Sequence, residues 1–346
     1  MKKLLSFICI FALLLACFAG CSAPKRTLNL YTWAGMFPPE VLEEFENTTG
    51  IKINYSNYDY GETMLSRLGA SAGEYDLIIA DDYIIEATIS QGLAQKLDYS
   101  LIPGAKNVNP LYKGQFFDKN DEYSIPYGAG VQTIVYNPDK VGLDIKGYGD
   151  LWDSALKDKV GIISNYRVIN GMALKTMGES YNVQDVNKIS AAGEKLKSLA
   201  PNIRLIKDDN IQDDLLSGEI DVAIMYTSQV TLAKMTKPSL KVVFPSEGIG
   251  FGIMGMFAPS SAKDASAAHE FIEYILTPEV SAKCFEYIGF YCTNSAADSL
   301  ISEQYRPFLT LPESFTKDNM EMIQNVTSEA DQAHLDVFTA FRGACE

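Results

Sequence analysis

Two aspartates and a tyrosine follow a short apolar run, and their types and spacing are suited to binding a ligand. The run is Tyr75–Ala80, and Asp81, Asp82 and Tyr83 come directly after it. An apolar run rich in branched residues is typical of a strand buried on both faces, as in a parallel sheet. In open α/β sheets, ligands bind at the carboxyl ends of the strands. The stretch therefore predicts a binding edge that carries two acids and a ring.

Three further residues stand at the ends of other predicted strands. Trp33, Asn165 and Tyr226 each follow a short apolar run, and the runs belong to two separate α/β units. Their shared position predicts a cleft between two lobes, lined by rings and a few polar groups. Each residue alone also has an ordinary explanation, in core packing or, for Asp81 and Asp82, in capping a helix.

The motifs that mark common enzymes and metal sites are absent from the sequence. There is no HExxH, no CxxC and no Walker loop, and residues 248–252 do not match the dinucleotide fingerprint. The only histidines, His269 and His334, lie in polar stretches and are expected at the surface. We predict no catalytic residue, no cofactor and no metal site. A secreted hydrolase that uses acids in the cleft stays open as an alternative.

Length and charge limit the class of protein. A chain of 346 residues, of which 47% are hydrophobic, is long enough for more than one domain. The formal net charge of −15 makes binding to nucleic acid implausible. Beyond position 21 the cysteines are Cys284, Cys292 and Cys345, an odd number, so a full disulfide framework is excluded while a Cys284–Cys292 pair stays open.

The first residues have the pattern of an export signal. Lys2 and Lys3 precede an apolar segment at 4–18, which is too short to span a membrane comfortably. Small residues before Cys21 resemble the lipobox of bacterial lipoproteins, and Cys17 is a weaker candidate. We expect residues 1–20 to be a lipoprotein signal peptide and Cys21 to be lipidated, which anchors an exported chain to a membrane. The alternative is an ordinary cleaved signal.

The order of elements predicts an α/β architecture. Strands and helices alternate from residue 28 to 80, which indicates a doubly wound parallel sheet, and a second α/β unit follows from about 159 to 244. Glycines at 128–130 and in 248–255 mark two crossovers between the lobes, where a hinge requires changes of backbone torsion. We assign 21–130 and 255–302 to lobe 1, and 131–254 and 303–346 to lobe 2.

Short segments along nearly the whole chain carry a resemblance to a known family. They are residues 30–33 (Leu-Tyr-Thr-Trp) with 38–39 and 43–45, 49–53, 62–64, 75–77, 123–127, 150–152, 172–174, 218–219, 245–248 and 288–289. In order and spacing the chain resembles the bacterial periplasmic polyamine-binding proteins, the spermidine/putrescine receptors of ABC importers. The resemblance implies a type II periplasmic-binding-protein fold: two doubly wound sheets joined by hinge crossovers, which close on the ligand.

The resemblance also implies a set of pocket residues. Trp33 and Tyr83 match a tryptophan and a tyrosine of the family's pocket, Tyr226 and Phe290 stand where it has a tryptophan and a tyrosine, and Gln324 falls near a polar position. Rings cover the methylenes of a polyamine and attract its ammonium groups, which pair with carboxylates.

The chain departs from the family at the acidic positions. Asn165 and Val168 replace an acidic pair, and Gly252 and Met254 replace a tryptophan and an aspartate. Asp81 stands where the family has a serine, so three expected carboxylates are lost and one is gained. Two ammonium groups facing a single carboxylate would be poorly paired.

From the residues and the resemblance together we predict the substrate-binding lipoprotein of an ABC importer, monomeric and not an enzyme. It would bind a polyamine or a related small organic amine between the lobes and deliver it to a permease. We expect it in the periplasmic space or on the outer face of the cell membrane. The alternatives are a receptor for an amino acid-like amine or for ferric ion, the secreted hydrolase, and a lipoprotein without a role in transport.

Overall fold

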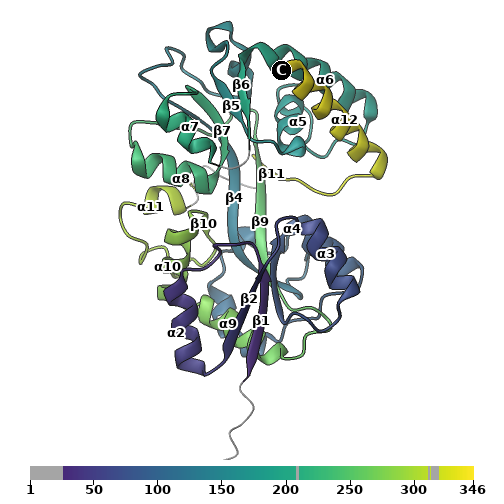
Figure 1. Ribbon diagram of the computed structural model, residues 1–346, viewed down its shortest axis with the longest axis vertical. Coiled ribbons are helices and arrows are strands. Elements are labelled where there is room, and N and C mark those ends of the chain that lie inside the picture. The colour runs from purple at the N-terminus through teal and green to yellow at the C-terminus, as the bar shows by residue number, and fades with distance from the viewer. Residues whose placement is uncertain (1–25, 208–209, 311, 313–318) are drawn as a thin grey trace, which may run out of the picture.

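The computed structural model describes residues 26–207, 210–310, 312 and 319–346, and it has two lobes, one above the other in Figure 1. The predicted signal peptide and Cys21 lie outside the described residues. No helix in the described ranges has the length and hydropathy needed to cross a membrane. The two-lobed α/β fold predicted from the sequence is confirmed.

The lower lobe is built on a mixed sheet in the order β2-β1-β3-β9-β4. Its first three strands in this order are parallel, and β9 is antiparallel to both of its neighbours. The strands are β1 (Thr27–Thr32), β2 (Lys52–Asn57), β3 (Leu77–Asp81), β4 (Ser124–Tyr136) and β9 (Ile249–Phe257). The helices are α2 (Pro39–Thr49), α3 (Gly61–Ala70), α4 (Asp82–Ser90), α9 (Ala265–Ile275) and α10 (Pro278–Ile288).

The upper lobe continues from β4 in the order β4-β7-β5-β6. Its strands are β5 (Val160–Ile162), β6 (Ile203–Ile206), β7 (Val222–Tyr226) and β8 (Lys241–Val243). Its helices are α5 (Tyr166–Lys175), α6 (Val186–Leu199), α7 (Ile211–Ser217), α8 (Thr227–Thr236) and α12 (Ser328–Cys345), which lies beside α6 in Figure 1. The small elements are β10 (Tyr291–Cys292), α11 (Arg306–Leu309), β11 (Met320–Met322) and 3-10 turns at Tyr99–Leu101, Pro103–Asn107, Pro110–Tyr112, Tyr148–Trp152, Ser154–Leu156 and Ala200–Asn202.

Both faces of each sheet are covered, which is why the central strands are apolar throughout. In β3, Leu77 and Ile79 pack into one lower-lobe core cluster, whereas Ile78 and Ala80 pack into another on the opposite face. In β7 the same alternation divides Val222 and Ile224 from Ala223 and Met225. Successive side chains of a strand point to opposite faces, so only a continuous apolar run fills both layers.

The strand β4 belongs to both lobes and passes between them without a break (Figure 1). Its residues up to Val131 pair with β9, and those from Gln132 pair with β7. At this change of partner the hydroxyl of Thr227 accepts a hydrogen bond from Val131 N (2.9 Å) and donates one to Val131 O (3.1 Å). The predicted first crossover is therefore a continuous strand, not a loop.

The glycines at the crossovers are required by packing as well as by any hinge. Neither Gly128 nor Gly130 has a positive φ. A Cβ added at Gly128 would lie 2.8 Å from Met254 Cε, and one at Gly130 would lie 3.0 Å from a ring carbon of Phe290. Because glycine has no side chain, positions 128 and 130 leave space for the side chains of Met254 and Phe290.

The structure corrects several local predictions. His269 and His334 are buried, at 4% and 0% exposure, so the expected surface location is wrong. Both are held by hydrogen bonds, His269 Nε2 accepting from the backbone of Asp98 and His334 facing Asn170. The helix α8 was not predicted. The thiols of Cys284 and Cys292 are both free and buried. The division of the chain into lobes stays a prediction. It assigns residues 303–346 to lobe 2, whereas Leu309 packs in the lower-lobe core.

Candidate functional site

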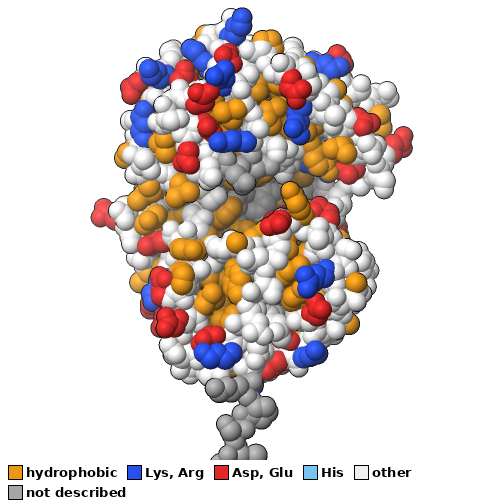
Figure 2. Space-filling model, in the orientation of Figure 1, with side chains coloured by type: hydrophobic (Ala, Val, Ile, Leu, Met, Phe, Trp, Pro, Cys, Tyr) orange, Lys and Arg blue, Asp and Glu red, His pale blue; other side chains and the backbone are white. Residues whose placement is uncertain are grey.

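A cleft of about 740 Å³ lies where the two lobes meet, and Figure 2 shows that this face of the molecule is hollowed at that level. Elements of both lobes contribute to its walls. All eight predicted ligand-binding residues line it, namely Trp33, Asp81, Tyr83, Asn165, Tyr226, Met254, Phe290 and Gln324. The strand-end argument thus brought together Trp33, Asp81, Tyr83, Asn165 and Tyr226, which are up to about 190 positions apart, whereas Met254, Phe290 and Gln324 came from the family resemblance.

Aromatic and apolar side chains form the floor of the cleft. Trp33 packs against both lower-lobe core clusters, and its ring centroid is 5.0 Å from that of Tyr58. Phe290 packs beside Gly130, and Met254 is 8% exposed. The floor can therefore cover the methylene groups of a ligand and remove them from water.

The two aspartates after β3 have different surroundings. Asp82 is 5% exposed, and its two carboxylate oxygens accept hydrogen bonds from Tyr83 N (2.7 Å) and Ile253 N (3.0 Å). It is the first residue of α4 and ties that helix to β9. Asp81 occupies the N-cap position of α4 but makes no capping hydrogen bond with its side chain. Of the two, Asp81 has the carboxylate that is open to a ligand in the cleft.

The acidity of both aspartates is weakened by their environment. Burial, with a smaller effect from the charge of Glu62, raises the pKa of Asp81 to about 7. Burial and the charge of Asp81 raise the pKa of Asp82 to about 8, although its hydrogen bonds from Ile253 and Tyr83 favour the ionised form. A cation bound in the cleft would stabilise the ionised carboxylates and so lower the pKa of both aspartates.

Two further carboxylates line the cleft that sequence reasoning did not assign to it. Glu62, on α3, accepts a hydrogen bond from the hydroxyl of Tyr83 (3.2 Å). Asp331, on α12, accepts one from the hydroxyl of Tyr166 (2.8 Å). Both acids stand in helices among other polar residues, so no local sequence signal distinguishes them from surface acids. The cleft therefore contains four carboxylates, three from the lower lobe and one from the upper.

One cation, Arg167, also lines the cleft. Its side chain is 9% exposed, and its guanidinium donates to Gln324 O (3.2 Å), Tyr181 O (3.3 Å) and Asn182 Oδ1 (3.5 Å). Its Nε atom is buried and has no hydrogen-bond partner in the described part of the chain. Burial lowers the pKa of this group from its usual value. Arg167 fixes the C-terminal segment to α5 and leaves one donor unused.

Asn165 has a structural role beside its place in the cleft. Its side-chain oxygen caps α5 by accepting hydrogen bonds from the backbones of Arg167 and Val168, both at 3.1 Å. α5 therefore begins at Tyr166, because this cap satisfies its first amides. Capping engages the acceptor of Asn165.

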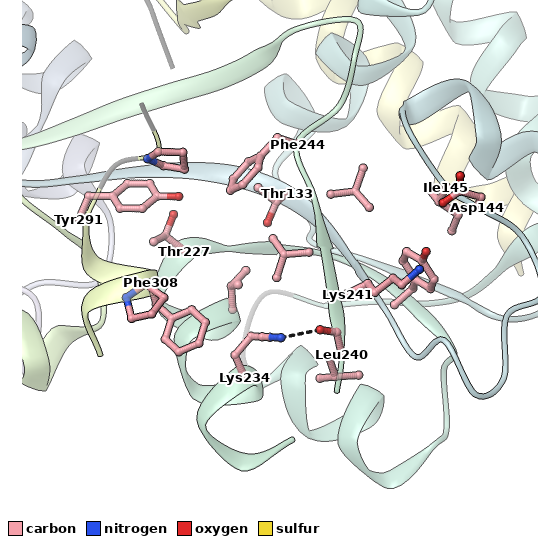
Figure 3. Close-up of a pocket in the computed structure, with 16 residues that line it drawn as sticks. Thr133, Asp144, Ile145, Thr227, Lys234, Leu240, Lys241, Phe244, Tyr291 and Phe308 are labelled. Atoms are coloured by element: carbon pink, nitrogen blue, oxygen red, sulfur yellow. Dashed lines mark hydrogen bonds between the residues drawn. The ribbon is translucent and has the colours of Figure 1, made fainter. Parts of the chain in front are cut away.

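A second cavity, of about 550 Å³, lies between β8, α8 and α11. Figure 3 shows Lys234 in its wall, donating a hydrogen bond to Leu240 O (2.6 Å), with Lys241 close by. The ammonium of Lys241 lies 5.7 Å from the centroid of the Tyr136 ring. Two cations and one acid, Asp144, make this cavity a poor site for an amine, so the cleft is the candidate site.

The described residues contain no group of three or more His, Cys, Asp or Glu side chains placed to hold a metal ion. In the cleft, Tyr83 and Tyr226 are the pair considered for ferric ion. Burial and neighbouring acids raise the pKa of Tyr83 well above its usual value, which opposes the phenolate that iron binding requires.

Comparison with known proteins gives consistent matches along the chain. The model of the family described as bacterial extracellular solute-binding protein matches residues 40–306. The spermidine/putrescine-binding periplasmic protein of Salmonella typhimurium is 33% identical over 295 residues, covering 85% of each chain. Its counterpart in Escherichia coli is 32% identical over 318 residues, covering 91% of each.

Solved structures agree with the sequence matches. A spermidine/putrescine ABC transporter substrate-binding protein from Streptococcus pneumoniae superposes with a TM-score of 0.85 at 27% identity. The superposition covers 93% of this chain and 100% of that one.

Proposed function

The chain belongs to the family of bacterial extracellular solute-binding proteins, with spermidine/putrescine-binding proteins among its relatives, and from this premise we propose that it captures a polyamine or related small organic amine for an ABC importer. The ligand binds in the cleft between the lobes, with Trp33, Asp81, Tyr83, Asn165, Tyr226, Met254, Phe290 and Gln324 in contact with it. A ligand that contacts both walls stabilises the closed form, which the permease then recognises.

The observation that carries this proposal is the combination of rings and carboxylates in one cleft. Rings cover methylenes and attract ammonium groups through their faces, and carboxylates pair with the same groups through charge-assisted hydrogen bonds. The family's acidic positions are occupied here by Asn165, Val168 and Met254. Glu62 and Asp331 supply further carboxylates to the cleft, one from each lobe.

The test is calorimetry of the purified chain with putrescine, spermidine and a panel of neutral compounds and amino acids. We expect binding of at least one polyamine and none of the neutral compounds. In Asp81→Asn the affinity falls about 10- to 100-fold, because a charge-assisted hydrogen bond is lost.

The matched control is Asp59→Asn, which removes an exposed aspartate of the same lobe and should leave affinity unchanged. No heat with any amine in the unmodified protein refutes the ligand class. Equal affinities in Asp81→Asn and the control refute the role of Asp81 alone.

Four finer assignments belong to the same proposal. Residues 1–20 act as a lipoprotein signal peptide, and Cys21 carries the lipid that holds the exported chain at the membrane. The chain works as a monomer that delivers its ligand to the permease. The lobes comprise 21–130 with 255–302, and 131–254 with 303–346. Support comes from the sequence around Cys21 and from relatives that are named as periplasmic proteins.

Arg167 favours an ω-amino acid as the second candidate ligand. It is the cation among the described residues that line the cleft, and a ligand carboxylate beside its guanidinium would be paired while an ammonium group pairs with Asp81. The same calorimetry with 4-aminobutanoate decides between the candidates. Tighter binding of 4-aminobutanoate than of putrescine would favour the second.

A further inference from the structure

The second cavity and the cleft share one wall where the lobes meet. In three segments of this wall, one residue lines the cleft and the next residue lines the cavity, as expected where successive side chains point to opposite faces. The segments lie between α8 and α11 on the left of Figure 1 and α4 and α5 on the right. The pairs are Gln132 with Thr133 on β4, Tyr226 with Thr227 where β7 meets α8, and Phe290 with Tyr291 at β10.

Both lobes contribute to the walls of the second cavity. The helix α8 and the strand β8 belong to the upper lobe. Tyr291 packs in a lower-lobe core cluster, and Phe308 lies on α11, whose Leu309 packs in the other lower-lobe cluster. A molecule in this cavity would therefore contact both lobes on the side of β4 opposite to the cleft.

The cavity contains positive charge that the protein does not neutralise. Within the described ranges, neither Lys234 nor Lys241 forms an ion pair with an Asp or a Glu. The ammonium of Lys234 donates to Pro238 O and to Leu240 O (2.6 Å), which uses two of its three donors (Figure 3). Burial lowers the pKa of Lys234, so its charge is incompletely solvated.

The acid that lines the cavity does not offset this charge. The side chain of Asp144 is 74% exposed, and its carboxylate lies 3.5 Å from Lys146 Nζ. In a chain with a net charge of −15, two lysines without an acidic partner along one cavity favour an anion as its occupant.

The remaining walls fit a molecule with one polar end and an apolar body. Thr133 is 1% exposed, and its hydroxyl lines the cavity without a hydrogen-bond partner in the part of the chain that is described. A buried hydroxyl without a partner is unfavourable, and a carboxylate oxygen would accept from it. Apolar surface comes from Val230, Leu240, Val242 and Phe308, and the volume of about 550 Å³ is within the range of small-molecule sites.

We propose that this cavity binds a small organic carboxylate, with the carboxylate beside Lys234 and Thr133, and that its occupancy strengthens ligand binding in the cleft. The coupling rests on the proposed function, whereas the site does not. An occupant in contact with both lobes stabilises the arrangement in which they are close together, and a ligand in the cleft favours the same arrangement. The coupling is reciprocal, so the amine strengthens carboxylate binding by the same factor.

Calorimetry of the purified chain with phenylacetate and with 2-phenylethanol tests the site, because the two probes share an apolar body and differ in charge. We expect phenylacetate to bind at least about tenfold more tightly. Lys234→Gln should weaken phenylacetate binding about 10- to 100-fold, since it removes the charge. Lys234→Arg keeps the charge and should retain more of the affinity.

Two further variants distinguish a lost contact from a disturbed fold. Thr133→Val keeps the shape of the side chain and removes its hydroxyl, and should weaken phenylacetate binding about three- to tenfold. Lys157→Gln removes an exposed lysine of the same lobe and should leave the affinity unchanged. Equal affinities for the two probes, or equal phenylacetate affinities in Lys234→Gln and Lys157→Gln, would overturn the site.

Titration of putrescine with and without saturating phenylacetate tests the coupling. We expect the affinity for putrescine to rise about three- to tenfold, and to stay unchanged by phenylacetate in Lys234→Gln. A fall in putrescine affinity that persists in Lys234→Gln would place phenylacetate in the cleft and overturn the inference. Unchanged putrescine affinity beside bound phenylacetate would overturn the coupling.

The outcomes separate the inference from the proposed function, since phenylacetate binding is measured without any amine. A protein that binds phenylacetate at Lys234 and no amine retains the second site, while the proposed function and the coupling fall. A protein that binds putrescine and not phenylacetate retains the proposed function, while the inference falls.

Discussion

Asp82 is a carboxylate that serves the fold of the lower lobe while lying at the edge of the cleft. Its oxygens connect α4 to β9 through the amides of Tyr83 and Ile253. Burial places its pKa at about 8 and that of Asp81 at about 7. The ligand-free protein therefore holds protons near neutral pH that the unfolded chain, with ordinary aspartates, has already released.

This difference predicts how stability depends on pH. Between pH 4 and 8 the folded state binds more protons than the unfolded state, so its free energy of unfolding falls as pH rises. His334, whose pKa is lowered to about 4 by burial, has the opposite effect, but only below its unfolded value of 6.5. From about pH 6.5 to 8 we expect stability to decrease, by at most about 1.4 kcal/mol per pH unit for each group.

Urea denaturation at a series of pH values measures this slope. Asp82→Asn should flatten it, whatever its effect on stability at a single pH, because the variant has no proton to lose at that position. Asp59→Asn should keep the slope of the unmodified protein. A stability that is constant or rising between pH 6.5 and 8 would show that the two aspartates are ionised in the folded state.

Thr227 is the side chain that completes the backbone hydrogen bonding of β4 where the strand passes from one lobe to the other. Replacing it with valine keeps the shape but leaves the amide and the carbonyl of Val131 without their partner. We expect Thr227→Val to lower the free energy of unfolding by about 1–3 kcal/mol. Thr236→Val, at the exposed end of the same helix, should cost less than about 0.5 kcal/mol in the same urea titration. Equal costs in the two variants would contradict the role of Thr227.

The sequence predicts most elements of this fold because its central strands are buried on both faces. The apolar run at Tyr75–Ala80 identifies β3, with an error of two residues at its start and one at its end. The helix α8 escapes prediction because Thr227–Thr236 is mainly polar and lacks a strong apolar stripe. His269 and His334 are buried because backbone groups and Asn170 satisfy them, and such partners are invisible in a local stretch.

The residues of the cleft were likewise predictable only where the local sequence indicates their position. Residues at strand ends were predictable, because the carboxyl ends of the strands lie at one edge of a sheet, however far apart the strands are in the chain. Glu62 and Asp331 were not, because each is one acid among several on a helix, and only the meeting of the lobes turns it toward the cleft. Asn165 was predicted to contact the ligand, but its role as the N-cap of α5 was not predicted, although asparagine is a common capping residue.

At the scale of the whole molecule, two hydrogen bonds connect the two lobes beside the cleft. The side-chain amide of Asn325, in the segment that leads into α12, donates to Glu86 Oε2 (2.7 Å) and to Tyr83 O (3.3 Å) on α4. These contacts stabilise the conformation in which the lobes are close together.

Removing this connection should open the ligand-free molecule. We expect Asn325→Ala to increase the radius of gyration in small-angle scattering and to weaken amine binding by less than about tenfold, since the bonds are exposed to solvent. Gln332→Ala, an exposed position of α12, is the control and should change neither quantity. Scattering profiles that coincide for all three proteins would show that the lobes stay together without Asn325.

The position of β9 between β3 and β4 has a consequence for the order in which the chain can fold. The lower-lobe sheet lacks the strand that joins β3 to β4 until residues 249–257 have been made, although its other four strands are complete by residue 136. A chain that emerges from its N-terminus therefore exposes unpaired edges of β3 and β4 for more than 100 residues of synthesis. The native sheet can close only after about three quarters of the chain is available. Such a topology delays the closure of the lower-lobe sheet until late in synthesis.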